Sequence, residues 1–391
     1  MAKRRYNGEG HISKYKRGGK NPWVGWRGVY TDPNTGGQRS VYGKTQAICA
    51  EKLNKKLEEI RKGAYVEPSG ETVESWLDRW FNDYYTIESK PSTAATAESN
   101  IRVHLKPAFG HIKLQKLNCD DLQQFIREKS KSLKPSTVDR MLSIFHKAIL
   151  QAIYLQKINR DPFIGLKKPK KEKAEINPLT RDEQTAWLKC VPSTTSGRAL
   201  KFLLNTGMRV SELVGLRWCD IQSDGIHVER NVLTIRDLQE DGYTDIEGTP
   251  KTESGKRVIP YNKNVRQLLE EQRRAQIEDR FRARGSWIGG DPGKGDCYVF
   301  TTRTGNHSDR NNINRLYRTT LEKAGISKRG VHSLRHTFAT NAVQLQVPIS
   351  DLSKMLGHSD PAFTIRTYVH PDRDGMQWAM ERLGELNSLQ G

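Results

Sequence analysis

The chain has 391 residues, and its 65 Lys and Arg against 45 Asp and Glu give it a formal net charge of +20. This length predicts two or three domains, and the positive excess favours a polyanion such as nucleic acid as the partner. A basic protein without a nucleic-acid role is the alternative. The sequence has no apolar run near the ~20 residues that a membrane span needs, so we expect no membrane partner and no secretion signal.

The cysteines give no sign of a cross-linked or metal-bound framework. Cys49, Cys119, Cys190, Cys219 and Cys297 are odd in number, widely spaced and free of any CxxC pair. This pattern predicts reduced thiols in a cytoplasmic protein rather than disulfides or a zinc site.

Half of the excess charge lies in the first sixth of the chain, since residues 1–62 contain 15 Lys and Arg but 5 Asp and Glu. Residues 23–30 are rich in aromatic and β-branched side chains and predict a strand, residues 39–42 predict the returning strand, and residues 45–61 have helical apolar spacing. We therefore expect a small sheet plus one helix over residues 1–64, with basic strands that face a DNA groove. A solvated tail before Trp23 is the alternative.

After a linker at residues 63–70, the spacing of apolar residues becomes helical, and residues 71–166 predict an all-α domain of four or five helices. Its first helix has apolar side chains on one face: Val73, Trp76, Leu77, Trp80, Phe81 and Tyr84. A second helix is expected over residues 93–104, a third after a cap at Asn118, and a fourth after a capping box formed by Ser136 and Asp139.

A basic linker at residues 167–173 leads to a last domain over residues 177–391, which opens with a capping box at Thr180. Its pattern is α+β and mostly helical, with a β-rich region over residues 221–260 and a polar helix over residues 264–284. A Gly-rich loop is expected over residues 285–295, within a long, charged stretch at residues 267–296.

The string from Thr206 to Leu213 predicts a helix that ends at Gly207 and a new helix that begins at Arg209. A guanidinium in front of a helix N-terminus lies where anions bind, and Glu212, three residues later, can orient it. An ordinary surface ion pair is the alternative.

Residues 249–260 predict a β-hairpin with Ser254 and Gly255 at its turn. Lys251 would then lie near a tip that can reach a substrate. Charged hairpin tips are common, so this feature alone indicates little.

In the string from His332 to Thr337, His332 and Arg335 are three residues apart and project from one helical face. His332 and His336 also have the spacing of metal ligands. Ser333 stands where the zinc protease motif requires Glu, so we predict no metal here.

Residues 350–368 predict two short helices, the first capped by Ser350 and ended by Gly357, and the second begun by Asp360. His358 lies between them and Tyr368 near the end of the second. The plain alternatives are a histidine that favours a helix C-terminus and a half-buried tyrosine.

These motifs together resemble the tyrosine recombinase (phage-type integrase) family, and the three-part layout resembles the integrases of Tn916-like conjugative transposons. The residues that match in type, order and spacing are Arg209, Lys251, His332, Arg335, His358 and Tyr368. The resemblance implies an arm-type DNA-binding domain at 1–64, a helical core-binding domain at 71–166, and a catalytic domain with a C-terminal tail at 177–391.

The resemblance also implies how the site residues act. Arg209 and Arg335 would clamp the non-bridging oxygens of a scissile phosphate, with His358 as a further donor and Glu212 behind Arg209.

Tyr368 would attack that phosphate to form a 3′-phosphotyrosine and release a 5′ hydroxyl, which Lys251 would protonate with help from His332. The covalent bond keeps the energy for rejoining, so neither a metal nor a nucleotide cofactor is expected, and the chain contains no GxxxxGK[ST] string.

The expected function is therefore site-specific recombination that integrates and excises a mobile element. The implied partners are duplex DNA with core and arm-type sites, three further copies of the chain in a tetramer, and accessory excisionase and host DNA-bending proteins. The tail around Met380 and Leu383 packs either on a neighbouring copy or within its own chain. Three other functions remain open: an inactive DNA-binding regulator, a metal-dependent nuclease and a type IB topoisomerase.

Overall fold

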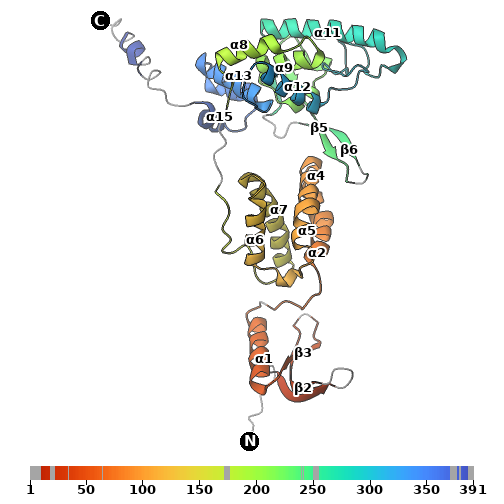
Figure 1. Cartoon of the computed structure of the whole chain (residues 1–391), viewed down its shortest axis with the longest axis vertical. Helices are drawn as coiled ribbons and strands as arrows, with labels where there is room; N and C mark the ends of the chain where they lie inside the picture. The colour runs from red at the N-terminus through yellow and green to blue at the C-terminus, as the bar shows by residue number, and fades with distance from the viewer. Residues whose placement is uncertain are drawn as a thin grey trace. The chain divides into compact units, whose positions relative to one another are not determined.

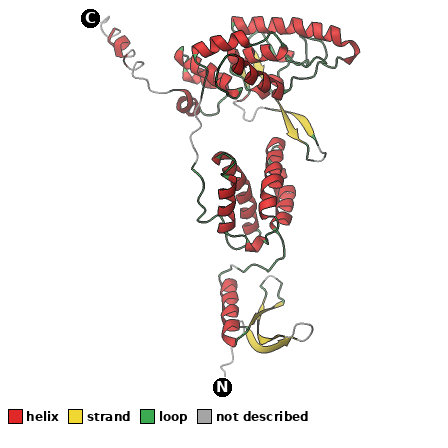
Figure 2. Cartoon of the chain, in the orientation of Figure 1, coloured by secondary structure: helices red, strands yellow, loops and turns green. Residues whose placement is uncertain are grey.

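The computed structural model describes residues 10–17, 23–33, 35–63, 65–170, 177–238, 240, 242–249, 255–369, 377 and 380–385. The chain divides into two compact units, Met1–Lys173 and Ala174–Gly391. The first contains a small sheet with its helix and a separate helical bundle, and the second is mostly helical with short strands (Figures 1 and 2).

The first unit begins with a three-stranded antiparallel sheet in the order β1-β2-β3. Its strands are β1 (His11–Arg17), β2 (Trp23–Thr31) and β3 (Gln38–Gly43). Helix α1 (Gln46–Arg61) follows, with Thr45 as its N-cap. The predictions for β2, β3 and α1 are confirmed, whereas β1 was missed because its polar alternation resembles a solvated tail.

Helix α1 packs against one face of this sheet, where a small core contains Tyr30, Leu53 and Tyr65. Gly28 lies on that face, and a Cβ there would lie 3.1 Å from the Val41 side chain and 3.3 Å from the Cys49 sulfur. The missing side chain therefore lets the helix approach the sheet closely.

The opposite face of the sheet carries aromatic and basic side chains. The guanidinium of Arg27 lies 5.8 Å from the centre of the Tyr15 ring, and the Tyr15 and Tyr42 rings are 5.3 Å apart. This face has no helix over it among the described residues, since α1 covers the other side.

The bundle of the first unit is built from four helical segments and a short turn. They are α2 (Val73–Trp80), η1 (Phe81–Tyr85) and α3 (Thr86–Glu88); α4 (Pro91–Asn100), η2 (Ile101–Leu105) and α5 (Lys106–Phe109); η3 (Leu114–Lys116); α6 (Cys119–Lys129); and α7 (Pro135–Tyr154). Trp76 is fully buried at the centre, and its indole N–H donates to the Ala148 carbonyl of α7 at 2.9 Å.

The start of α6 agrees with the sequence, because Asn118 and Asp121 form a capping box. The capping box predicted at Ser136 and Asp139 is wrong. Helix α7 begins at Pro135, whose fixed φ suits a first helical position, and no side chain caps it.

The described residues of the second unit up to Tyr368 form α-helices together with short strands. The elements are α8 (Arg181–Cys190), α9 (Thr195–Thr206), α10 (Val210–Val214), η4 (Trp218–Asp220), β4 (Ile226–Val228), β5 (Asn231–Arg236), β6 (Tyr243–Gly248), β7 (Arg257–Ile259), α11 (Lys263–Ala283), η6 (Arg284–Ser286), α12 (Arg310–Lys323), α13 (His332–Gln344), α14 (Ile349–Leu356) and α15 (Pro361–Tyr368). One core contains residues from α8 to α13 and from β4, β5 and β7, and a smaller core contains residues from α13, α14 and α15.

Most of the first strand of the hairpin predicted at residues 249–260 lies outside the described residues, which stop at Thr249 and resume at Gly255, so the hairpin stays a prediction. Strand β6 pairs with β5, and β7 pairs with β4, in two separate two-stranded sheets. The β5–β6 hairpin projects from the helical body in Figure 1. Lys251 lies outside the described residues.

The polar helix predicted at 264–284 is confirmed as α11, and its buried glutamines explain how so polar a helix docks. Gln272 donates to the Val299 carbonyl at 2.9 Å, and Gln276 donates to the Tyr298 carbonyl at 2.7 Å. These bonds satisfy main-chain carbonyls of Tyr298 and Val299, which follow the predicted Gly-rich loop.

Two short helices complete the unit. Gly357 ends α14 in the left-handed conformation and Asp360 caps α15 ahead of Pro361, as predicted. The predicted Ser350 cap is wrong, because α14 already begins at Ile349 after Pro348.

No helix among the described residues is long and apolar enough to cross a membrane. Near the C-terminus, Met380 and Leu383 are exposed on the single chain. Packing on a neighbouring copy stays a prediction for this tail.

We predict that Trp76→Ala lowers the free energy of local unfolding of α2 and α7 by about 3–5 kcal/mol, because it leaves a cavity in the bundle. Hydrogen exchange of the full chain, followed in peptides from these helices, measures this change. Tyr154→Ala at the exposed end of α7 is the control and should leave exchange unchanged. Equal protection in both variants would contradict this account of the bundle core.

Candidate active site

Arg209 lies where the sequence predicts, at the N-cap of α10. Gly207 ends α9 with a φ of 64°, and a Cβ at this position would lie 2.4 Å from the ring of Phe338. Both the backbone conformation and the contact therefore require glycine, and the tight connection sets Arg209 in front of α10.

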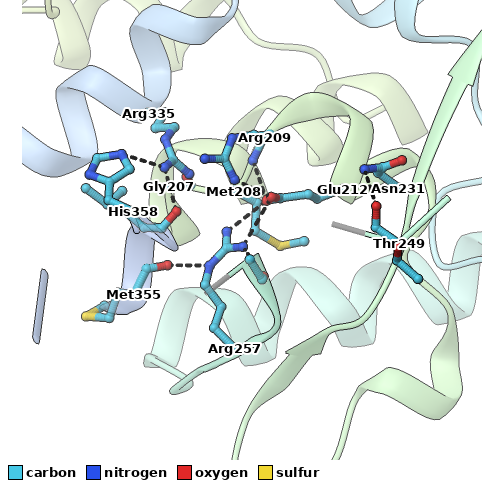
Figure 3. A network of polar contacts seen from close by, with 12 residues as sticks. Gly207, Met208, Arg209, Glu212, Asn231, Thr249, Arg257, Arg335, Met355 and His358 are labelled. Atoms are coloured by element: carbon cyan, nitrogen blue, oxygen red, sulfur yellow. Dashed lines mark hydrogen bonds and ion pairs between the residues drawn. The ribbon is translucent and has the colours of Figure 1, made fainter. Parts of the chain in front are cut away.

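Glu212 fixes Arg209 from behind. Its carboxylate accepts from the Arg209 backbone N–H at 2.9 Å and from Nη1 at 2.7 Å (Figure 3). The carboxylate is almost fully buried, whereas the Arg209 side chain is 38% exposed. The ion pair is thus half buried, and the free part of the guanidinium remains open to a ligand.

Arg257 is a second partner of Glu212, and the sequence analysis missed it. Its Nη1 and Nη2 donate to the two carboxylate oxygens at 3.1 and 2.8 Å, and its Nε donates to the Met355 carbonyl at 2.7 Å (Figure 3). Arg257 thereby joins β7 to α10 and to the end of α14. In the sequence, Arg257 is only a charged residue at the start of a short predicted strand, and such residues are too common to indicate a functional role.

Burial by itself would raise the pKa of Glu212, but hydrogen bonds and positive charge from Arg257, with the charge of Arg209, lower it to about 2. Glu212 is therefore ionised at neutral pH, and it stays so although its side chain is nearly inaccessible.

Arg335, from the first turn of α13, is 2% exposed. Its Nη1 donates to the Gly207 carbonyl at 2.9 Å, and its Nη2 donates to the Leu356 carbonyl at 2.5 Å and to His358 Nε2 at 2.9 Å. Arg209 and Arg335 lie near one another in Figure 3, and the charge of Arg209 acts on Arg335.

Burial, followed by repulsion from Arg209 and Arg257, lowers the pKa of Arg335 to about 9, and Glu212 offsets only part of this. The cluster therefore has more positive charge than its buried carboxylate neutralises. Such a site favours an anion, and guanidinium forks match the oxygens of a phosphate.

His358 lies between α14 and α15, with its Nδ1 2.8 Å from the Thr364 hydroxyl. Since Arg335 donates to Nε2, the ring is neutral with its proton on Nδ1. Burial, then the charges of Arg335 and Arg209, lower the pKa of His358 to about 4. A bound anion that drew Arg335 away would free Nε2 and favour its protonation, as a donor role requires.

His332 is the first residue of α13, and its ring centre lies 4.7 Å from that of His336. Burial, followed by the charges of His336, Arg335 and Arg209, lowers the pKa of His332 to about 4. Among the described residues, no group of three or more His, Cys, Asp or Glu has a geometry that could hold a metal ion.

Tyr368 is the last residue of α15 and is 6% exposed. Its ring lies parallel to that of His358, with centres 6.5 Å apart, and its hydroxyl is 2.8 Å from His336 Nδ1. Burial raises the pKa of Tyr368, while the charges of Arg335 and Arg209 act to lower it. The phenol thus lies within the field of both arginines.

The structure therefore gathers Arg209, Glu212 and most of the later motif residues at one place, although they come from separate parts of the sequence. The other members of this cluster are His332, Arg335, His358 and Tyr368. His336 belongs there as well; in the sequence it stood out only for its metal-like spacing from His332.

Two models of phage integrase domains match this chain. The model of the phage integrase family matches residues 169–374, which is more than half of the chain. The N-terminal SAM-like domain of phage integrases matches residues 72–130.

Curated relatives include a XerC-like tyrosine recombinase of Caldanaerobacter subterraneus subsp. tengcongensis, 29% identical over 367 residues that cover 89% of this chain and 92% of the relative. The transposase of transposon Tn916 from Enterococcus faecalis is 26% identical over 196 residues, which cover 47% of this chain and 44% of that protein.

Two solved structures share the fold. The integrase of transposon Tn1549 with a circular intermediate DNA has a TM-score of 0.63 at 22% identity, over 80% of this chain and all of that one. The lambda integrase tetramer on a Holliday junction has a TM-score of 0.56 at 16% identity, over 95% and 99% of the two chains. On these matches, the chain belongs to the phage integrase family of tyrosine recombinases and is a site-specific DNA recombinase.

Proposed function

We propose that this recombinase binds a scissile phosphate of duplex DNA between Arg209 and Arg335 and attacks it with Tyr368. The observation behind the proposal is that a buried and a half-buried guanidinium act on the same phenol, in a cluster with more positive charge than its carboxylate neutralises. A phosphodiester supplies the missing negative charge, and its non-bridging oxygens fit the two forks.

The attack forms a bond between the Tyr368 oxygen and phosphorus and breaks the bond from phosphorus to the 5′ oxygen of the next nucleotide. Negative charge on the non-bridging oxygens increases as the nucleophile adds, and fixed donors that are already in place stabilise it most. His358 is the third donor in this proposal, and Glu212 holds Arg209 so that it need not reorganise.

Lys251 is the proposed acid that protonates the leaving 5′ oxygen, with assistance from His332. This assignment rests on the resemblance of the motif around Lys251 to that of the family. The 3′-phosphotyrosine keeps the energy of the broken bond, so the reverse reaction with another 5′ hydroxyl completes strand exchange.

At the level of the whole chain, we propose that residues 1–64 bind arm-type sites, residues 71–166 bind the core site, and residues 177–391 carry catalysis. Four copies would hold two duplexes, a proposal supported by the structure of a lambda integrase tetramer bound to a Holliday junction. The reaction would integrate and excise a mobile element in the bacterial cytoplasm, with an excisionase and a host DNA-bending protein as accessory partners.

The free face of the N-terminal sheet is the part that we propose contacts an arm-type site. Arg27 lies over the Tyr15 ring and its Nε donates to the Ser40 hydroxyl at 2.8 Å, so its head is held on a flat aromatic surface. A two- or three-stranded sheet of this kind can enter the major groove and present such side chains to base edges.

We predict that Tyr368→Phe abolishes covalent attachment to DNA while leaving DNA binding intact. The probe is a duplex library with a randomised centre and a nick, from which denaturant-resistant complexes are captured, sequenced and mapped by peptide mass spectrometry. Tyr154→Phe, the same change at an exposed tyrosine, is the control. An adduct on another side chain, or equal capture by Tyr368→Phe, would refute the proposed nucleophile.

We also predict that Arg27→Gln weakens binding to arm-type duplexes by about 1–3 kcal/mol, as expected for loss of a base-edge contact. The measurement is the dissociation constant on duplexes selected by the full wild-type chain, at one fixed salt concentration. Arg61→Gln, on the exposed side of α1, is a charge-matched control and should bind more nearly as wild type. Equal losses in both variants would mean that the sheet face is not the contact.

A further inference from the structure

His336 contacts the reacting oxygen of the proposed mechanism, yet that mechanism gives it no role. Its Nδ1 lies 2.8 Å from the Tyr368 hydroxyl, and this bond joins α13 to α15. Because Tyr368 is 6% exposed, its hydroxyl proton needs an acceptor within the protein. Among the described residues, His336 is the hydrogen-bond partner of this oxygen.

The direction of this hydrogen bond follows from the protonation states. Burial and the charge of Arg335 lower the pKa of His336, and burial raises the pKa of Tyr368. At neutral pH the imidazole is therefore uncharged and the phenol protonated. The phenol donates to the Nδ1 lone pair, and His336 carries its own proton on Nε2.

His332, the other histidine of this helix, makes no such contact. Its ring meets that of His336 edge to face, with centres 4.7 Å apart, and the hydrogen bond to the Tyr368 hydroxyl comes from His336. Of the two histidines one helical turn apart, the one in hydrogen-bond reach of the nucleophile is His336.

We propose that His336 is a catalytic residue that accepts the Tyr368 proton as the phenolic oxygen attacks phosphorus. This inference rests on the proposed function of Tyr368. The proton moves from Oη to Nδ1, the bond from Oη to phosphorus forms, and the bond from phosphorus to the 5′ oxygen breaks. The 5′ oxygen takes its proton from the leaving-group acid. On rejoining, the imidazolium returns its proton to the departing tyrosine.

The arrangement ties the strength of this base to the presence of DNA. The charged and titratable groups around His336 are His332 and Arg335 on its own helix, Tyr368 on α15, and His358 beyond the Tyr368 ring. Without DNA, the charge of Arg335 disfavours protonation of His336. A phosphodiester on Arg335 offsets that charge, so His336 becomes a better base when a substrate is present.

The test is single-turnover covalent cleavage of the captured, nicked duplex by the full chain. His336→Gln keeps an oxygen that can accept the phenolic hydrogen bond but cannot take up the proton. We expect it to bind DNA as wild type does and to cleave about 10²–10⁴-fold more slowly near neutral pH. Its rate should rise with pH as Tyr368 ionises, whereas the wild-type rate should level off once His336 is neutral.

A more acidic nucleophile separates proton acceptance from a structural role. With 3,5-difluorotyrosine at position 368, which ionises near neutral pH, the His336→Gln chain should regain most of its lost rate. Arg335→Lys, which damages the phosphate clamp instead, should keep its defect with either nucleophile.

Near wild-type cleavage by His336→Gln, or a defect that the fluorinated tyrosine leaves unchanged, would overturn the role of His336. Covalent capture by Tyr368→Phe would instead overturn the proposed function on which it rests, so the two failures can be told apart.

Discussion

The site depends on a buried carboxylate that holds two arginines in fixed positions and leaves a third unneutralised. Glu212 bonds Arg209 and Arg257, and Arg335 lies close enough that both of these cations lower its pKa. Burying charge is unfavourable unless it is compensated. The buried guanidinium groups are stabilised here by hydrogen bonds to main-chain carbonyls and to the Glu212 carboxylate. Because positive charge remains after this compensation, the folded cluster favours binding of an anion.

This preference connects the remote parts of the catalytic unit. The Gly207 turn sets Arg209, β7 brings Arg257, and the carbonyls of Gly207 and Leu356 hold Arg335. Helix α9 and helix α14 end at this cluster, and strand β7 begins there. The hydrogen bonds that hold Arg257 and Arg335 also fix the C-terminal end of α14 next to His358. Stability and chemistry therefore use the same hydrogen bonds, and a change at Glu212 or Arg257 would disturb both.

Much of this could be predicted from local sequence. Capping residues such as Thr180 and Asp360, the glycine ends at Gly207 and Gly357, and helical apolar spacing are all short-range signals. Two local predictions were wrong, the caps at Ser136 and Ser350, where helices begin at or just after a proline instead. Other features were missed because they depend on distant partners. Strand β7 pairs with β4 and not with its neighbour β6, and Arg257 and His336 gain meaning only from Glu212 and Tyr368, which lie far away in the chain. The motif residues were assigned to one site because they resemble those of a known family, since a single sequence does not reveal which of them are in contact.

Titration of His358 reports directly on whether a DNA phosphate binds the excess positive charge of the arginine cluster. Nuclear magnetic resonance of the labelled imidazole gives its pKa in the free chain and with the captured duplex bound to the Tyr368→Phe variant. The free value should be about 4, because burial and the charges of Arg335 and Arg209 disfavour the imidazolium, and it should rise when the phosphate binds. A pKa that is the same with and without DNA would contradict the account.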